Sequence, residues 1–583
     1  MKFIIFLFEG IFIFEKKELK RKYDLVIYFF KNISLIEYIK FFFNRNDYNP
    51  IKIQEFKEYI KAVRKKKLFT SNNCEKKNIK EKIYVETFIN HPAYTLSNVI
   101  VAKYLQKLKG GQVIGIIRKN DLKSEILFRA YGVKNFSYFY GPNFFLRIFY
   151  LIKSIVININ LADFKKSINF KYNSIDVGLT SYDTYIRYLG KPTINKIDTQ
   201  FLIFFAESLY ATDFFQKKLF FDRNKKTSLI QSETQFHPLN NLFQVCLKNK
   251  TEVFSRSGLE EFTLRHYNNW QQRYSYRGSF SQKLFNFVFS KFRKKSLMYF
   301  KSLYQKKIRK KMFGVDEVIL GLSKNKKILI SKSKFIMKKK LNRNPIVIFF
   351  LTHLLDGNFN YGYRKNFKDI YSSTKFLMDL ISKTDEINWI IKKHPNEGYF
   401  KAKLDFSSRI DKLVKQKKNI TMFDEKYDAS SLLNIADLAF TVSGSVGVEY
   451  PSFGINTVFY EKSYYSNLDF FKIEKPKNIT TKFIKRNIKK KLPKNYIEKC
   501  KTYIFIKDIV AKSRSSLIPS YIPSRKLNEK VFWKNSKNLV NIYDQNKDNF
   551  YHMFKRQLKF KMRHTINSNL VDTKNSIFSD YND

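Results

Sequence analysis

The sequence predicts an α/β protein built from two Rossmann-like, doubly wound domains with additional helices. The chain has 583 residues, which is too long for one ordinary domain. Two separate regions alternate short apolar runs with segments of helical spacing, as parallel sheets flanked by helices do. Hydrophobic residues make up 44% of the chain, enough for large buried cores. No internal repeat is visible, so the two domains share an architecture and not a sequence.

The first alternating region begins at residue 81. The run 83–89 predicts a strand, and residues 97–109 carry apolar side chains at helical spacing. Gly110 and Gly111 end this helix as a C-cap does, and the run 112–118 predicts the next strand. A strand, a helix and a strand in this order predict parallel pairing.

The rest of the first half carries weaker patterns. Residues 123–133 predict another helix, and the apolar run 153–162 fits a strand or a helix. Residues 200–340 look largely helical, with basic clusters that are densest at 306–311 and 337–340.

The second region alternates more clearly. A helical turn is expected over 446–454, just after the fourth of five predicted strands. The strands are 345–353, 388–395, 419–424, 438–444 and 457–461, and helices are predicted at 366–384 and 428–436. We therefore divide the chain into five regions. These are an N-terminal extension without assigned function (1–80), an N-terminal Rossmann-like domain (81–299), a basic connector (300–343), a C-terminal Rossmann-like domain (344–475) and a helical region with a polar tail (476–583).

The charge balance is strongly basic, with 110 Lys and Arg against 50 Asp and Glu, a formal net charge of +60. Such a balance often indicates nucleic-acid binding. The lysines are spread over the whole chain, however, and no helix-turn-helix, RRM or zinc-finger pattern accompanies them, so we expect no nucleic acid. The excess has two open explanations: biased base composition, or a surface that works beside anionic lipid or a polyanionic product.

The cysteines and the N-terminus bear on location. The apolar run 3–14 is interrupted by Glu9 and is shorter than the roughly 20 residues a membrane span needs, so we expect a buried strand. The run 26–43 is amphipathic. We expect a cytoplasmic protein, with peripheral contact at the inner membrane face left open. Three cysteines lie far apart and fit a reducing compartment: Cys74, Cys246 and Cys500.

Small residues gather where the strand 438–444 gives way to a helix. A turn of this kind exposes backbone N–H groups and can hold a phosphate. Glu449 falls in the first turn of the following helix and could accept hydrogen bonds from a ribose. The alternative is a tight strand-helix turn with a helix-stabilising Glu. The turn residues are Ser443, Gly444, Ser445 and Gly447.

Two further clusters follow predicted strands of the same domain. Lys392, Lys393 and His394 close the strand at 388–395, at the carboxyl end where open α/β sheets bind ligands. They could pair with a phosphate leaving group without a metal, or form a basic strand end on the surface. His353 and Asp356 follow the first strand of this region and could lie at the mouth of a cleft.

Several of these segments together resemble a known family. The matching segments are FFLTHLLDGNFNYG (349–362), WIIKKHPNE (389–397), SSLLNIADLAFTVSGSVGVEYPSFGINTVFYE (430–461) and SYYSNLDF (463–470). In order and spacing they resemble the C-terminal domain of bacterial capsule and surface-polysaccharide biosynthesis proteins, GT-B-like transferases related to the capsule Kdo-transferase group. The similarity is clear over Ile346 to about Asp469 and extends more faintly through 176–187 and 232–240.

The resemblance implies roles for particular residues. It implies two domains facing a cleft, with the sugar nucleotide held by His394, Ser443, Ser445 and Glu449. Two positions depart from the family pattern: Ser445 stands where Thr is common, and Ile455-Asn456 replaces Lys-Pro. The resemblance also implies an acceptor side with a catalytic base on the first domain. The candidates for this base, in order, are Asp183, Glu86 and His91, and Asp183 could instead cap a helix or pair with Arg187.

The sequence therefore predicts a metal-independent glycosyltransferase that moves a sugar from a nucleotide donor to a lipid-linked or polysaccharide acceptor. No Asp-x-Asp pair, GxxxxGK[ST] loop or Cys/His metal spacing occurs, so neither cofactor nor metal is expected. Two alternatives remain: a CDP-polyol phosphotransferase of the teichoic-acid type, and a basic polyanion-binding protein without catalysis.

Overall fold

The computed structural model describes most of the chain between residues 53 and 567. The described ranges are 53–69, 81–89, 91–119, 121–219, 226–257, 262–276, 278–309, 328–355, 357–358, 366–394, 406–519 and 528–567. The apolar runs at 3–14 and 26–43, Asp356, and the polar tail after 567 lie outside them.

The N-terminal domain is built on a six-stranded sheet with the order β3-β2-β1-β4-β5-β6. The first five strands are parallel, and β6 runs antiparallel to β5. The predicted parallel pair is present, with Ile83 of β1 opposite Val113 of β2. The strands are β1 (Lys82–Glu86), β2 (Gln112–Arg118), β3 (Asn135–Phe139), β4 (Thr227–Gln231), β5 (Glu252–Ser257) and β6 (Thr263–Tyr267).

Helices cover both faces of this sheet because successive strand side chains alternate between them. Ile83 and Val85 pack with α5 and α6 on one face, whereas Tyr84 packs with α9, α10 and α11 on the other. The expected helix at 97–109 begins earlier, at Pro92, because the side chain of His91 caps it. The helices are α5 (Pro92–Lys109), α6 (Leu122–Ala130), α7 (Phe144–Leu161), α8 (Phe164–Asn169), α9 (Val177–Leu189), α10 (Thr199–Lys218) and α11 (Leu239–Lys248).

The region 200–340 differs from the prediction. It contains long helices but also β4, β5 and β6, and β4 lies in the middle of the sheet. These strands are five or six residues long, and β5 and β6 carry charged residues such as Glu252 and Arg265. Short polar strands between strongly helical segments leave little period-2 signal. The open assignment at 153–162 is a helix, the second half of α7.

The C-terminal domain has a five-stranded sheet with the order β11-β10-β7-β8-β9, in which every described pairing is parallel. All five strands were predicted, and each is shorter than expected. The strands are β7 (Ile346–Phe350), β8 (Asn388–Lys392), β9 (Ile420–Met422), β10 (Leu438–Thr441) and β11 (Thr457–Phe459), and the helices are α14 (Lys332–Lys339), α15 (Ile370–Ile381), α16 (Phe406–Gln416), α17 (Leu432–Ile435) and α18 (Val446–Glu449). The predicted fold class, two doubly wound domains with additional helices, is confirmed.

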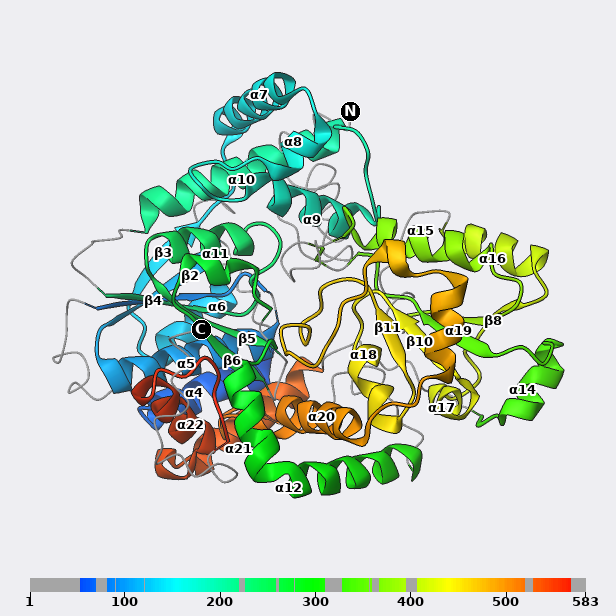
Figure 1. Ribbon diagram of the computed structural model, residues 1–583. Helices are drawn as coiled ribbons and strands as arrows, with labels where there is room; N and C mark the ends of the chain where they lie inside the picture. The colour runs from blue at the N-terminus through cyan, green and yellow to red at the C-terminus, as the bar shows by residue number, and fades with distance from the viewer. Residues whose placement is uncertain are drawn as a thin grey trace.

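Of the remaining helices, some connect the two domains and others cover one of them (Figure 1). The helix α12 (Gln282–Arg309) leaves the N-terminal domain and packs against α20 (Lys494–Phe505), where Ser296 Oγ lies 3.0 Å from Thr502 Oγ1. The chain then returns: α21 (Glu529–Ile542) packs on α4 (Gln54–Lys65) of the N-terminal domain, with α22 (Asn549–Lys559) beside them, whereas α19 (Thr481–Lys489) stays with the C-terminal domain. The domain boundaries drawn from the sequence stay a prediction.

Candidate functional site

The candidate site lies at the carboxyl edge of the C-terminal sheet. Strands β7 and β10 are neighbours, and the chain continues from them toward opposite ends of the sheet, to β8 and β9 on one side and β11 on the other. Loops that leave adjacent parallel strands in opposite directions open a crevice, which is where such sheets bind ligands. The loop after β7 carries His353, the turn after β10 carries Ser443, and His394 follows β8.

The two predicted histidines of this edge lie together. The ring centroids of His353 and His394 are 5.6 Å apart. Burial lowers the pKa of His353 to about 3, with further electrostatic contributions from Arg187 and His394. His353 is therefore neutral at physiological pH and can serve as a hydrogen-bond partner, but not as a cation.

The turn after β10 is fixed by hydrogen bonds to its backbone. Gly444 N donates to Thr441 Oγ1 at 3.0 Å, and Ser463 Oγ donates to the carbonyl of Ser443 at 2.7 Å. Tyr465 Oη donates to the carbonyl of Gly444 at 2.9 Å. These contacts hold the carbonyl groups in place, so the turn has one shape before any ligand arrives.

Glycine is required at position 447 by close packing. A Cβ atom at Gly447 would lie 1.8 Å from Tyr465 Oη, closer than any non-bonded contact allows. The helix that begins here, α18, has only four residues and continues into a 3-10 turn at Pro451–Phe453. The predicted helical turn at 446–454 is thus present, and it ends at Gly454 in the left-handed region with φ +87°.

The hydroxyl of Ser443 is the most informative polar group of the turn. Ser443 is buried, and within the part of the chain that the structure describes its Oγ has no hydrogen-bond partner. A buried hydroxyl without a partner costs about 1–3 kcal/mol, so a ligand group that bonds to it is favoured. Gly444, Ser445 and Glu449 beside it are half-buried and reachable.

Three basic residues lie at the carboxyl end of β8. Lys392, Lys393 and His394 are all half-buried. Lys392 Nζ donates to the carbonyl of Lys393 at 3.1 Å, which turns this ammonium back along its own chain. Pro395 lies outside the described residues, as Asp356 does.

Glu86, one of the candidate bases, lies at the carboxyl edge of the other sheet, at the end of β1. It is fully buried, and its carboxylate accepts the backbone N–H groups of Phe88 and Ser232, each at 2.6 Å. Burial raises the pKa of Glu86, and these two hydrogen bonds oppose the rise. Because Ser232 follows β4, the carboxylate ties together the two strands at the switch point of the N-terminal sheet.

His91, a second candidate base, caps α5. Its Nδ1 accepts the N–H of Ala93 at 3.3 Å, and burial, followed by the charge of Arg256, lowers the pKa of His91 to about 4. His91 is therefore neutral at physiological pH. It lies in the loop between β1 and α5 and not at the edge of the C-terminal sheet.

Asp183 contacts the other domain. It is buried on α9, and its Oδ1 accepts the backbone N–H of Asn358 at 2.9 Å. Asn358 belongs to the loop after β7, the same loop that carries His353. Asp183 is thus the candidate base brought to the edge of the C-terminal sheet, where it also fixes the course of that loop.

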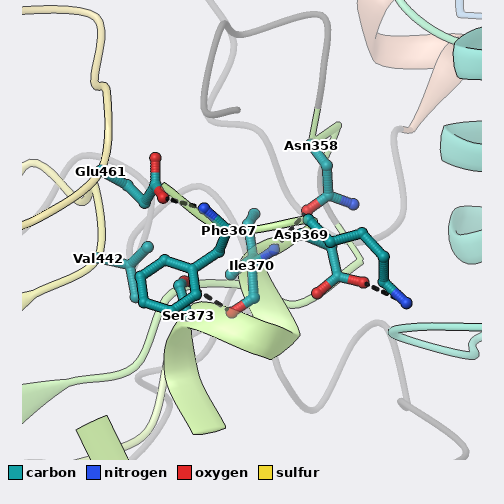
Figure 2. A pocket seen from close by; sticks show the side chains of 8 residues that line it. Asn358, Phe367, Asp369, Ile370, Ser373, Val442 and Glu461 are labelled. Atoms are coloured by element: carbon teal, nitrogen blue, oxygen red, sulfur yellow. Dashed lines mark hydrogen bonds and ion pairs between the residues drawn. The ribbon is translucent and has the colours of Figure 1, made fainter. Parts of the chain in front are cut away.

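Helix α9 and the segment after it make further contacts with the C-terminal domain. Tyr182 Oη and Thr193 Oγ1 both donate to Asp369 Oδ2 at 2.6 Å, and Lys368 Nζ donates to the carbonyl of Ile194 at 2.7 Å. Figure 2 shows the small pocket beside this junction, where the carboxylate of Glu461 accepts the backbone N–H of Phe367 at 2.9 Å. The pocket is lined by Asn358, Phe367, Lys368, Asp369, Ile370, Ser373, Val442 and Glu461.

Arg187, expected from the sequence only as a partner of Asp183, is a further functional candidate. Its guanidinium lies 5.7 Å from the ring centroid of Phe236 in its own domain and 3.5 Å from the carbonyl of Leu355 in the other. Arg187 is half-buried. The signal in the sequence was its spacing: four residues after Asp183, it shares that residue's face of the helix.

Among the described residues, no three His, Cys, Asp or Glu side chains gather in a way that could hold a metal ion. The absence of a metal requirement stays a prediction. One described helix, α7, is long and apolar enough to cross a membrane by length and composition.

Comparisons with known proteins give fold-level similarities. No family model matches the chain, and no curated protein matches it. Among solved structures, one similar chain is the Thermosulfurimonas dismutans KpsC, a beta Kdo 2,4 transferase, with a TM-score of 0.27 and 9% identity over 54% of this chain and 87% of that one.

Another is the UDP-GlcNAc 2-epimerase from Neisseria meningitidis bound to UDP-GlcNAc, with a TM-score of 0.21 and 12% identity over 73% of this chain and 98% of that one. At these TM-scores the similarities carry no argument about function. The two doubly wound sheets themselves establish the kind of fold.

Proposed function

We propose that the protein is a glycosyltransferase that moves a sugar from a nucleotide donor to a growing capsule or surface polysaccharide, without a metal, in the cytoplasm. The observation that carries the proposal is the switch point of the C-terminal sheet. The buried hydroxyl of Ser443, which has no hydrogen-bond partner among the described residues, lies in the turn after β10, at the same sheet edge as the His353–His394 pair after β7 and β8. Hydrogen-bonding side chains at such an edge suit the phosphates and hydroxyl groups of a sugar nucleotide.

Each group of this edge has a specific task in the proposal. The backbone and hydroxyls of Ser443 and Ser445 hold a donor phosphate, and Glu449 accepts hydrogen bonds from the ribose. His394 and Arg187 face the negative charge that develops on the leaving phosphate, so the stabilisation is electrostatic. Arg187 suits this task because a guanidinium stays charged at every working pH and can bond a phosphate in a bidentate manner.

Transfer to the acceptor needs a base on the N-terminal domain. Asp183 is favoured by its position at the domain junction, whereas Glu86 ends β1 and His91 caps α5, both in the N-terminal domain. The acceptor hydroxyl would lose its proton to the base while its oxygen attacks the anomeric carbon, and the nucleotide would leave with its phosphate charge balanced by Arg187.

Thermal stabilisation of the purified protein by a panel of CMP-, CDP-, UDP- and GDP-linked donors tests the proposal. A ligand at about 100 times its Kd adds roughly 2.7 kcal/mol to the free energy of unfolding. We expect one nucleotide class to stabilise the wild type and Glu125→Ala, a control on α6 of the N-terminal domain, but not Glu449→Ala or Ser443→Ala.

Two results would replace the proposal. Stabilisation by CDP-glycerol alone would favour the CDP-polyol phosphotransferase. Stabilisation by oligonucleotides or anionic polysaccharide and by no donor would favour a polyanion-binding protein, whose binding would weaken steeply with salt.

A further inference from the structure

The surface of α7 carries a row of exposed apolar side chains. Phe145, Phe149, Ile152, Val156 and Ile159 are 78%, 57%, 56%, 50% and 69% exposed. Their spacing of four, three, four and three residues places them on one face of the helix. Single exposed apolar residues are common on protein surfaces, but a row of this length marks an interaction site.

The opposite face of α7 is fixed to the N-terminal domain. Tyr150, Leu151, Ser154 and Asn158 are buried there. Ser154 Oγ donates to the carbonyl of Leu202 on α10 at 2.9 Å, and Tyr150 Oη donates to Asp213 Oδ2 at 2.7 Å. In Figure 1 the helix lies along α10 on the outside of the domain, at the top of the view.

This attachment decides how α7 can meet a bilayer. The strand β3 ends at Phe139, five residues before α7, and α8 starts at Phe164, three residues after it. Both ends therefore return to the body of the domain, and the inner face stays on α10. A helix held in this way lies flat in the surface of a membrane and does not cross it.

The charges around α7 suit an anionic surface. The helix contains no Asp or Glu, and its Arg147 and Lys153 are half-buried, with Lys153 Nζ 3.8 Å from Asp213 Oδ2 of α10. The exposed positive charges therefore come from the neighbouring helix. Next to its C-terminus, α8 exposes Lys165 and Lys166, beside a single exposed acid, Asp163. In a chain with a net charge of +60, this arrangement joins an apolar face with a basic border, which is the combination that binds anionic lipid headgroups.

We propose that α7 is a membrane-surface anchor, and that its apolar face inserts into the headgroup region of an anionic bilayer. Basic and apolar contributions act together: the lysines attract the headgroups, and the five apolar side chains leave water. The proposal does not depend on the transferase activity, because it concerns the outer surface of the N-terminal domain and not the site at the C-terminal sheet.

Sedimentation with vesicles tests the anchor. The full chain is mixed with vesicles of phosphatidylcholine, or of phosphatidylcholine with about a third phosphatidylglycerol. We expect the wild type to bind the anionic vesicles, and the triple variant F145S/F149S/I159S to lose about tenfold or more in partition coefficient. A control variant with three equally exposed apolar residues replaced elsewhere, M298S/M337S/I542S, should bind like the wild type.

A second variant keeps the test decisive if the triple variant does not fold. Phe149→Trp places a fluorescent side chain on the apolar face, and brominated lipids should quench its emission more than that of the wild type. Of the three wild-type tryptophans, Trp389 and Trp533 are buried, and Trp270 is half-buried with the guanidinium of Arg273 over its ring. Equal quenching, equal binding of the triple variant and the wild type, or no wild-type binding to anionic vesicles would each overturn the anchor.

Sedimentation velocity without lipid tests whether a second copy of this chain, instead of a membrane, covers the apolar face of α7. If the wild type self-associates and F145S/F149S/I159S does not, the face of α7 is a contact between copies of this chain, and the membrane proposal is wrong. We expect both to sediment alike. If the protein binds anionic vesicles through α7 but no nucleotide donor stabilises it, the anchor is supported and the transferase proposal is wrong.

Discussion

Arg187 and His353 belong to different domains, yet the guanidinium of Arg187 contributes to the low pKa of the His353 imidazole. Burial is the larger cause, and together with Arg187 and His394 it brings the pKa of His353 to about 3. A permanent positive charge from one domain therefore acts on a neutral imidazole of the other, at the edge where the C-terminal sheet is expected to bind its ligand.

Removing Arg187 should raise the pKa of His353 without restoring its ordinary value. In Arg187→Ala the positive charge is lost but burial remains, so the pKa should rise above about 3 and stay below 6.5. A pH titration of the histidine ring signals by NMR measures this, with Arg129→Ala on α6 as a control of equal charge. An unchanged His353 signal would show that the guanidinium does not act on the ring in solution.

The same variant should weaken donor binding if Arg187 holds the leaving phosphate. Loss of one charge-assisted hydrogen bond costs about 1.5–3 kcal/mol, which corresponds to roughly 10- to 100-fold in Kd. Calorimetric titration with the donor found in the thermal panel measures it. Arg187→Lys should recover part of the affinity, because it keeps the charge and loses the bidentate geometry. Equal affinities of Arg187→Ala and the wild type would remove Arg187 from the site.

Stability should fall as the pH drops below about 6.5. Burial lowers the pKa values of His237 and His266 to about 4 and that of His353 to about 3, so each ring is neutral in the folded state where the unfolded chain binds a proton. Protonation therefore favours the unfolded state, by roughly 1.4 kcal/mol per pH unit for each histidine between about pH 6.5 and 4. Above pH 6.5 these groups contribute no pH dependence.

Urea unfolding at a series of pH values measures this slope, and one substitution isolates a single histidine. His266 stacks on Phe254 with ring centroids 4.5 Å apart, so His266→Phe replaces it by a ring that does not titrate. Below pH 6.5, the free energy of unfolding of this variant should change less steeply with pH than that of the wild type, by roughly 1.4 kcal/mol per pH unit. An identical slope would mean that His266 is not buried in its neutral form.

Glycine at position 447 should be needed for stability. In Gly447→Ala the new Cβ meets Tyr465 Oη at 1.8 Å, and either the tyrosine or the turn must move. Overpacking of this kind costs about 1–3 kcal/mol, and movement of the turn should also lower donor affinity. Thermal unfolding compares it with Gly278→Ala, whose Cβ would meet only the ring of Tyr276 at 3.1 Å. Equal melting temperatures of the two variants would contradict the close packing.

The hydrogen bond from Tyr182 to Asp369 should couple the unfolding of the two domains. Tyr182→Phe removes one donor from a buried carboxylate across the junction, at a cost of about 1–3 kcal/mol. Tyr185→Phe is the matched control, because Tyr185 donates to Asp198 within one domain. Calorimetry should show a broadened or divided transition for Tyr182→Phe alone. A single sharp transition in both variants would mean that the junction is held by its other contacts.

The sequence predicted the C-terminal sheet better than the N-terminal one for a physical reason. Strands such as β7, with the sequence IVIFF, are buried on both faces and therefore form continuous apolar runs. The strands β5 and β6 form the antiparallel edge, and β6 includes Arg265 and His266, so its burial is not visible from composition. Their place in the sheet depends on tertiary packing that local pattern does not record.

The residues of the candidate site also differ in how far the sequence predicts them. His353, His394 and Ser443 were predicted because each closes a strand, and parallel strands bring such residues to one edge. The contact of Asp183 with Asn358 and the position of Arg187 depend on how the two domains meet, which strand and helix patterns do not specify. The strand pattern therefore indicates the half of the site on the C-terminal sheet. On α9, Asp183 was named as a candidate base through the family resemblance, whereas the position of Arg187 emerges only from the assembled structure.

The path of the chain limits how the domains can move. The C-terminal domain is joined to the N-terminal domain by two crossings, α12 on the way out and α20 with the segment after it on the way back. The helices α12 and α20 lie side by side, with Ser296 Oγ 3.0 Å from Thr502 Oγ1. A single tether would allow the domains to swivel in any direction. Two parallel tethers act as a double hinge, so opening is restricted to rotation about one axis, and a protease cut in either crossing would leave the two halves connected.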